Sequence, residues 1–212
     1  ARMTGQKSEI GRILDGVSGD FWFISIYAAI CLRLTPEWSY WIWILAAVTG
    51  LCHSKQAAMA DYYRNIHLFF LKEKSGSELD NYVQQKAIYN SLSWKKDFIR
   101  KLFLWFYCDY TRSQERLTPA FQRFFALLQQ RYGAVAPQEI RDEFRRESLP
   151  LMKYTNILSF NTRVTVLFIS LLINEPWLYF VFELTVLNGL LIYMIWQHER
   201  LSNKLYKEIQ MS

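Results

Sequence analysis

Residues 157–173, ILSFNTRVTVLFISLLI, and residues 177–196, WLYFVFELTVLNGLLIYMIW, decide the fold class of this chain. Both stretches are predominantly apolar, and each approaches the roughly 20 residues that an α-helix needs to cross the hydrocarbon core of a bilayer. Only Asn-Glu-Pro, residues 174–176, lies between them. A connection this short joins antiparallel neighbours. The sequence therefore predicts a helical hairpin that crosses a membrane twice.

Two more apolar blocks occupy the N-terminal third of the chain. The first runs from about residue 16 to residue 34 and is closed by Thr-Pro-Glu, and the second runs from Trp38 to residue 72 without a proline. A continuous helix over 38–72 would be roughly 50 Å long at about 1.5 Å per residue, longer than the ~30 Å hydrocarbon core. We therefore expect its second half either to project into the cytoplasm or to bend at Gly50.

The positive charges lie mainly in the middle of the chain. The formal net charge is +6, and most of the 25 lysine and arginine residues fall between residues 54 and 155, whereas the short connections 35–37 and 174–176 hold none. This distribution is typical of membrane proteins with basic cytoplasmic segments. It predicts an all-α, polytopic membrane bundle of about four spans, with both ends and the middle on the cytoplasmic side. Anionic lipid headgroups, rather than nucleic acid, account for the charge.

Residues 73–155 change from apolar blocks to amphipathic stretches, in which aromatic and leucine side chains recur at helical spacing opposite lysine and arginine. The positions that define two apolar stripes are Phe98, Leu102, Trp105 and Phe106, then Phe121, Phe124, Phe125 and Leu128. Two interpretations remain open: helices that lie along a membrane surface, or a soluble helical cap that packs on itself. The chain thus divides into membrane helices at 1–72, a helical cytoplasmic or interfacial insert at 73–155, and a transmembrane hairpin with a basic tail at 156–212.

Several ionisable residues fall within or beside the apolar blocks, where each costs about 2.5–3.5 kcal/mol on insertion into a membrane. Glu183 lies deep in the last block, and a buried hydrogen bond between helices explains it better than catalysis. Arg163 lies in the first turns of the third block, on the expected cytoplasmic side. Lys55 and Arg64 belong to the projecting half of the second block. Solvated or snorkelling roles come first for these three basic residues, and contact with an acceptor phosphate is the alternative.

The chain opens on ARMTGQKSEIGRILDGVSGD, residues 1–20. Ala-Arg, eight residues, Gly11, three residues and Asp15 follow one another directly before the first apolar block. This spacing resembles the latter part of the signature of the CDP-alcohol phosphotransferase (CDP-alcohol phosphatidyltransferase) family, D-x2-D-G-x2-A-R-x8-G-x3-D-x3-D. Residues 53–65, HSKQAAMADYYRN, are also similar to bacterial-type members. The resemblance implies a fold of six spans, of which this chain holds about four, and a chain that begins inside the motif, after two metal-binding aspartates.

The resemblance implies a reaction in which an alcohol displaces CMP from a CDP-linked lipid such as CDP-diacylglycerol. In the family, Mg²⁺ or Mn²⁺ bridges the diphosphate of the substrate to carboxylates, which are the ligands that such ions prefer. Asp15 would be a metal ligand. Ala1, Arg2 and Gly11 would lie against the nucleotide, where small residues let it approach the backbone.

The same resemblance implies partners and a location. The partners are the CDP-linked lipid, the alcohol acceptor, membrane lipids and a second copy of the chain in a homodimer, with no nucleic acid. The location is a bacterial inner membrane, in which a multi-pass protein has its active site on the cytoplasmic side. Lys55, Arg64 and Arg163 are the basic candidates for contact with the acceptor.

The motif departs from the family pattern at its last aspartate. The family has aspartate at position 19, where this chain has Gly19 followed by Asp20. On a regular helix, position 19 lies about 40° from Asp15, whereas Asp20 lies about 140° away. Asp20 would act as the catalytic base for the attacking hydroxyl only if the helix is locally distorted, which Gly16 and Gly19 permit. The departure keeps open a second hypothesis, a catalytically inactive relative or a non-enzymatic helical membrane protein that binds lipid or a partner.

Overall fold

The computed structural model describes residues 9–72, 79, 81–133 and 135–211, and the side chains of residues 9–18, 20 and 72 lie outside the description. Every secondary-structure element of this part of the chain is helical, in agreement with the predicted all-α class. In chain order the elements are α1 (Glu9–Trp38), α2 (Trp41–Lys72), α3 (Tyr82–Ser91), α4 (Phe98–Leu117), α5 (Pro119–Tyr132), α6 (Gln138–Ser148), the 3₁₀ turn η2 (Leu149–Leu151), α7 (Met152–Ile157), α8 (Phe160–Leu172), α9 (Trp177–Phe182), the π-helical turn η3 (Glu183–Leu187) and α10 (Asn188–Met211).

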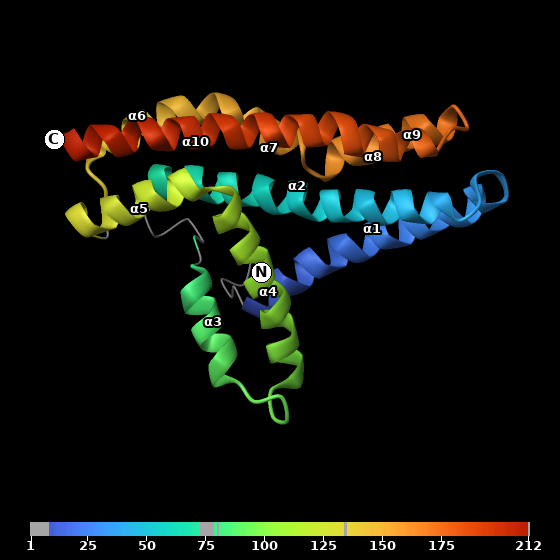
Figure 1. Ribbon diagram of the computed structural model, residues 1–212, viewed down its shortest axis with the longest axis horizontal. Helices are drawn as coiled ribbons and strands as arrows, with labels where there is room; N and C mark the ends of the chain where they lie inside the picture. Colours follow the sequence, from blue (N-terminus) through green and yellow to red (C-terminus); the bar gives the residue numbers. More distant parts are fainter. Residues whose placement is uncertain (1–8, 73–78, 80, 134, 212) are drawn as a thin grey trace, which may run out of the picture.

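Helices α1 and α2 form an antiparallel pair (Figure 1). α1 continues to Trp38, beyond its predicted end near residue 34. Pro36 is tolerated because it removes only one backbone donor in the last turn, and the Ser39 amide still donates to the Thr35 carbonyl over 2.9 Å. The chain then reverses at Ser39, whose φ of 55° lies in the left-handed region.

Helix α2 runs without a break from Trp41 to Lys72 and passes through Gly50. The helix is thus continuous through Gly50, and projection of its second half into the cytoplasm stays a prediction. The first half of α2 packs against α1, whereas the second half packs against α6 and α7. The second half of α2 is therefore covered by helices other than α1.

Helices α8 and α9 form the hairpin that the sequence predicts over 157–196, and α10 continues the second arm. Asn174 turns the chain with a φ of 62°, a conformation that asparagine adopts more readily than most residues. The side chain of Arg33 donates to the side chain of Asn174, and the rings of Trp38 and Trp177 lie 5.6 Å apart. The two turns therefore meet at the same end of the bundle (Figure 1).

Two helical segments of the described chain, 138–172 and 177–211, are long and apolar enough to cross a membrane. Further crossings by α1 and α2 remain predictions. Large apolar side chains point outward from the bundle: Phe21 and Trp22 on α1 are each 69% exposed, and Leu172 on α8 is 84% exposed. Extended exposed apolar surfaces are uncommon on soluble monomers, so these faces suit contact with lipid.

Two apolar clusters form the interior. One lies between α1, the first half of α2, α8 and α9. The other lies between the second half of α2, α5, α6 and α10, where the rings of Phe70 and Phe144 stack at 4.0 Å. Phe121, Phe124 and Leu128 of the second predicted stripe are buried in this cluster. The apolar stripe of α5 is therefore covered by the rest of the protein, whereas the nature of the whole insert stays a prediction.

Helices α3 and α4 form another hairpin, which projects from the bundle at a wide angle (Figure 1). α4 is fixed to α2 at one end, because Gln114 donates its side-chain amide to the Ala58 carbonyl over 2.8 Å and Tyr110 donates to the Asp61 carboxylate over 3.3 Å. Burial, and then the charge of Asp61, raise the pKa of Tyr110, so its hydroxyl stays protonated. Of the predicted insert, α5 and α6 belong to the core, whereas the far ends of α3 and α4 stand outside it.

Candidate functional site

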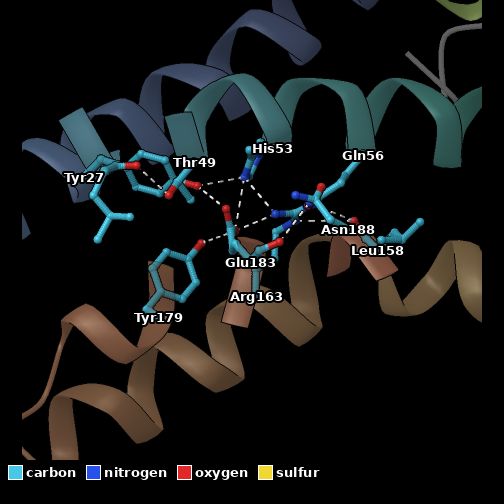
Figure 2. Close-up of polar contacts among 10 residues, drawn as sticks. Tyr27, Thr49, His53, Gln56, Leu158, Arg163, Tyr179, Glu183 and Asn188 are labelled. Atoms are coloured by element: carbon cyan, nitrogen blue, oxygen red, sulfur yellow. Dashed lines mark hydrogen bonds and ion pairs between the residues drawn. The ribbon is translucent and has the colours of Figure 1, made fainter. Parts of the chain in front are cut away.

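A cluster of polar side chains lies inside the bundle, between α1, α2, α8 and η3 (Figure 2). At its centre, Arg163 of α8 and Glu183 of η3 form an ion pair, with Nη1 and Oε1 2.5 Å apart. The two side chains are 1% and 0% exposed. A charge buried this deeply costs several kcal/mol unless it is paired and hydrogen-bonded. The remaining contacts of both groups therefore decide what the cluster can do.

Both carboxylate oxygens of Glu183 are occupied. Tyr179, one turn earlier, donates to Oε1 over 2.6 Å, and Tyr27 of α1 donates to Oε2. His53 of α2 places its Nδ1 3.3 Å from Oε1. The carboxylate thus gathers partners from α1, α2, α8 and α9. This confirms the prediction that Glu183 makes a buried hydrogen bond between helices.

The guanidinium of Arg163 is likewise fully engaged. Its Nη2 donates to Gln56 Oε1 over 2.7 Å, and both Nη2 and Nε donate to the Leu158 carbonyl over 3.3 Å. Nη1 lies 2.9 Å from His53 Nδ1, which accepts when it is unprotonated. The Leu158 carbonyl is available because the helical path breaks between α7 and α8. Arg163 therefore caps this break in addition to pairing with Glu183.

Gln56 joins α2 to the π-helical turn. Its Nε2 donates to the main-chain carbonyl of Glu183 over 3.0 Å and to Asn188 Oδ1 over 2.6 Å. A π turn interrupts the regular ladder of hydrogen bonds in a helix and is frequent at functional sites. Gln56 supplies a donor to the carbonyl at the start of this turn, so the turn and α2 hold each other in place.

The cluster is a brace rather than an open reaction site. Its charged and amide groups bond to one another, and Phe23 covers the His53 ring with ring centres 4.2 Å apart. General acid–base chemistry requires a side chain that reaches the substrate, whereas these groups face one another inside the bundle (Figure 2). We call this cluster, Tyr27, His53, Gln56, Arg163, Tyr179, Glu183 and Asn188, the polar brace.

The three predicted acceptor-binding residues differ in burial. Arg163 is buried in the polar brace, whereas Lys55 and Arg64 are exposed on α2. An acceptor phosphate could bind Arg163 only by displacing its contacts to Glu183 or Gln56. Contact of these three residues with an acceptor stays a prediction.

The N-terminal motif lies at the start of α1. Gly11, Asp15 and Asp20 belong to this helix, but the side chains of Asp15 and Asp20 lie outside the described part of the chain, and Ala1 and Arg2 precede it. The predicted nucleotide, metal and catalytic contacts of these five residues therefore stay predictions.

The path of α1 bears on the spacing of the two aspartates. Across Gly16 and Gly19 the described backbone remains α-helical, so Asp20 lies about 140° around the helix from Asp15. The local distortion that would bring the two carboxylates together does not occur in this backbone. No described atom lies within 4 Å of a Cβ added to Gly19, so this position has room for a side chain.

The motif and the polar brace are separate places on α1. Tyr27 follows Asp15 by twelve residues, which is roughly 18 Å along the helix axis. Among the residues whose side chains are described, no group of three or more His, Cys, Asp or Glu could hold a metal ion. Tyr27 connects α1 to the brace through its hydrogen bond to Glu183.

Comparisons of the chain with protein-family models, with curated proteins and with solved structures found no match. Within the chain, the sequence did not predict that Tyr27, His53, Gln56 and Tyr179 belong to the brace. The only sequence feature that indicated a polar cluster was the presence of two opposite charges, an arginine and a glutamate, in the two arms of one apolar hairpin.

Proposed function

We propose that this chain belongs to a membrane enzyme that transfers a phosphatidyl-type group from a CDP-linked lipid, such as CDP-diacylglycerol, to an alcohol, with release of CMP. The observation that carries the proposal is the spacing Ala-Arg, eight residues, Gly11, three residues, Asp15 at the start of a long helix with an apolar outer face. A lipid substrate and a water-soluble acceptor meet at a bilayer surface, and the motif lies where such a helix begins.

The proposed placement is an integral, multi-pass arrangement with four spans, formed by α1, the first half of α2, α8 and the pair α9–α10. The two turns that meet at Arg33 and Asn174 are at one end of these helices. The motif is at the other end, together with the basic segments that favour the cytoplasmic side of a bacterial inner membrane. The family resemblance further suggests a homodimer through membrane helices.

The metal would be Mg²⁺ or Mn²⁺, and it would neutralise the diphosphate of the lipid substrate. Asp15 would contribute one carboxylate. Such ions require several oxygen ligands, so Asp15 alone would not be sufficient to hold one. Ala1, Arg2 and Gly11 would lie along the nucleotide.

The acceptor hydroxyl would attack the phosphorus on the lipid side of the diphosphate. A new P–O bond forms to the acceptor, the P–O bond to CMP breaks, and the hydroxyl proton must be accepted by a base. Asp20 would take this role only if the helix, which is regular in the described backbone, distorts when the substrate and the metal bind; otherwise the base comes from elsewhere.

The test is release of CMP by the purified full-length protein. CDP-diacylglycerol, Mg²⁺ or Mn²⁺ and a panel of acceptors (inositol, inositol phosphate, glycerol phosphate and serine) should give CMP with at least one acceptor. Asp15→Asn should abolish the release, whereas Asp142→Asn, at an exposed aspartate on α6, should leave it unchanged. Metal binding without CMP release from any acceptor would overturn the proposal.

A second candidate is a catalytically inactive relative that binds lipid or a partner. It is favoured by Gly19 in place of aspartate and by the uninterrupted helix at this point. Gly19→Asp restores the family spacing at a position with room for the side chain. Activity that appears only in Gly19→Asp supports the inactive relative, whereas activity in the natural protein that is lost in Asp20→Asn supports the enzyme.

A further inference from the structure

An apolar stripe on α4 is exposed and is left uncovered by the described part of the chain. It consists of Phe98, Ile99, Trp105 and Phe106, of which Ile99 is 68% and Trp105 50% exposed. At about 100° per residue, these four positions fall within a sector of about 120°. The buried side chains of α4 lie on the opposite side of the helix: Leu104, Cys108, Thr111 and Gln114. α4 therefore has an exposed apolar face opposite the face that the protein buries.

Basic and aromatic side chains gather at the tip of the α3–α4 hairpin, next to this stripe. Lys95 and Lys96 are exposed. Lys101 lies over the rings of Tyr89 and Trp94, with its Nζ 4.8 and 5.5 Å from the ring centres. Apolar and aromatic side chains beside lysine are characteristic of helices at the boundary between acyl chains and anionic headgroups.

The hairpin also lies at the level along the bundle where such a boundary is expected. Trp38 and Trp41 mark the turn at one end, and α4 is bonded to α2 at Ala58. The rise from Trp41 to Ala58 is roughly 25 Å at about 1.5 Å per residue, close to the ~30 Å thickness of a hydrocarbon core. On α10, the exposed Trp196 lies roughly 28 Å from Trp177 by the same measure. Aromatic side chains are therefore found at both of these levels, as at two membrane interfaces.

The direction of the hairpin agrees with this level. α3 and α4 run across the long axis of α2 and α10 (Figure 1), so they would lie along the surface of a membrane that the bundle crosses. We propose that the α3–α4 hairpin is an interfacial anchor, which inserts the stripe Phe98, Ile99, Trp105 and Phe106 among the headgroups of a bilayer that contains anionic lipid.

The anchor has a mechanical consequence for α1. α4 contacts α1 as well as α2. Insertion of the hairpin into the headgroup layer would therefore also fix the depth of the N-terminal part of α1 in the membrane. The inference rests on the membrane placement of the bundle and is independent of transferase activity.

The experiment uses the whole protein in lipid nanodiscs, with an environment-sensitive fluorophore at Ile99→Cys or Phe106→Cys. Cys52 is replaced by alanine, and the other two cysteines are buried. Gln130→Cys, on the exposed face of α5, is the matched control. In discs with anionic lipid, we expect blue-shifted emission at both hairpin sites and quenching by nitroxide-labelled lipid. We expect red-shifted emission and quenching by aqueous iodide at the control site.

Three other outcomes would overturn the proposal. Equal quenching by iodide at the hairpin and control sites would place the stripe in water. Shielding that persists in lipid-free detergent and grows with protein concentration would show that a second copy of the chain covers it. Lys95→Gln combined with Lys96→Gln should abolish the additional blue shift in anionic relative to neutral discs, and an unchanged difference would contradict recognition of headgroup charge. None of these readouts depends on release of CMP.

Discussion

Arg163 and Glu183 each depend on the other for their stability inside the bundle, because neither side chain reaches water. Removal of one partner leaves the other charge buried without compensation, and this typically costs about 3–5 kcal/mol. Removal of both charges avoids most of that penalty. The pair is therefore a test of whether the polar brace stabilises the fold.

We expect Arg163→Met to lower the free energy of unfolding by about 3–5 kcal/mol. Glu183→Gln should lower it less, because an amide oxygen in the place of Oε1 can still accept from Arg163 and Tyr179. The double variant should be more stable than the sum of the single effects predicts. Unfolding in detergent measures all three variants, with the exposed Lys55→Met as the control. Additive effects would show that the two charges do not stabilise each other.

His67 is a second residue whose charge state is coupled to folding. Its Nδ1 lies 2.7 Å from Ser148 Oγ, and burial, followed by the nearby charge of Arg145, lowers its pKa. His67 therefore stays neutral in the folded protein at a pH where the unfolded chain already binds a proton, just below the ordinary histidine pKa of about 6.5. The contribution of His67 to stability is present above that pH and is lost as the pH falls towards the lowered pKa of the folded state.

The corresponding prediction is a fall in melting temperature between about pH 7.5 and about pH 5.5 that is smaller in His67→Gln than in the natural protein. Glutamine retains a polar group for Ser148 but does not titrate. Thermal unfolding of both proteins in the same detergent measures the difference. Identical pH dependence in the two proteins would exclude His67 as a source of it.

At the scale of elements, the polar brace connects the π-helical turn η3 to α2 through Gln56. Replacement of Gln56 by leucine keeps the approximate volume but leaves a carbonyl of Glu183 and the side chain of Asn188 without this donor. We expect a loss of about 1–3 kcal/mol and faster hydrogen exchange across 183–188. The exposed Gln130→Leu on α5 should change neither quantity. Unchanged exchange in Gln56→Leu would show that η3 is held by its own backbone alone.

The sequence was sufficient to predict helices but not the surfaces that cover them. The hairpin at 157–196 was predictable because three residues cannot separate two long apolar stretches in any other way. The stripes on α4 and α5 have the same periodicity, yet Phe124 is buried and Phe106 is exposed. Periodicity identifies an apolar face and does not identify its partner. For the same reason Arg163 and Glu183 were recognised singly, whereas their pairing with each other and with His53 required the three-dimensional arrangement.

At the scale of the whole molecule, the bond between Arg33 and Asn174 fixes both short turns at one end of the bundle, and the C-terminal part of α10 lies at the other end (Figure 1). If the bundle crosses the membrane four times, the two turns must share one side and the end of α10 must face the opposite side. Positive charge favours the cytoplasm for the latter.

Single cysteines can test this topology in a variant without Cys52, since Cys31 and Cys108 are buried. We expect a membrane-impermeant maleimide to label the exposed positions Tyr40→Cys and Glu175→Cys in intact cells, and Lys207→Cys only after permeabilisation, because the bilayer separates the two ends of the bundle. Labelling of residues 40 and 175 from opposite sides would contradict the antiparallel four-span arrangement. Labelling of residue 207 in intact cells would instead show that the bundle has the reverse orientation in the membrane. The motif at the start of α1 would then face away from the cytoplasm and from the CDP-linked substrates that we propose.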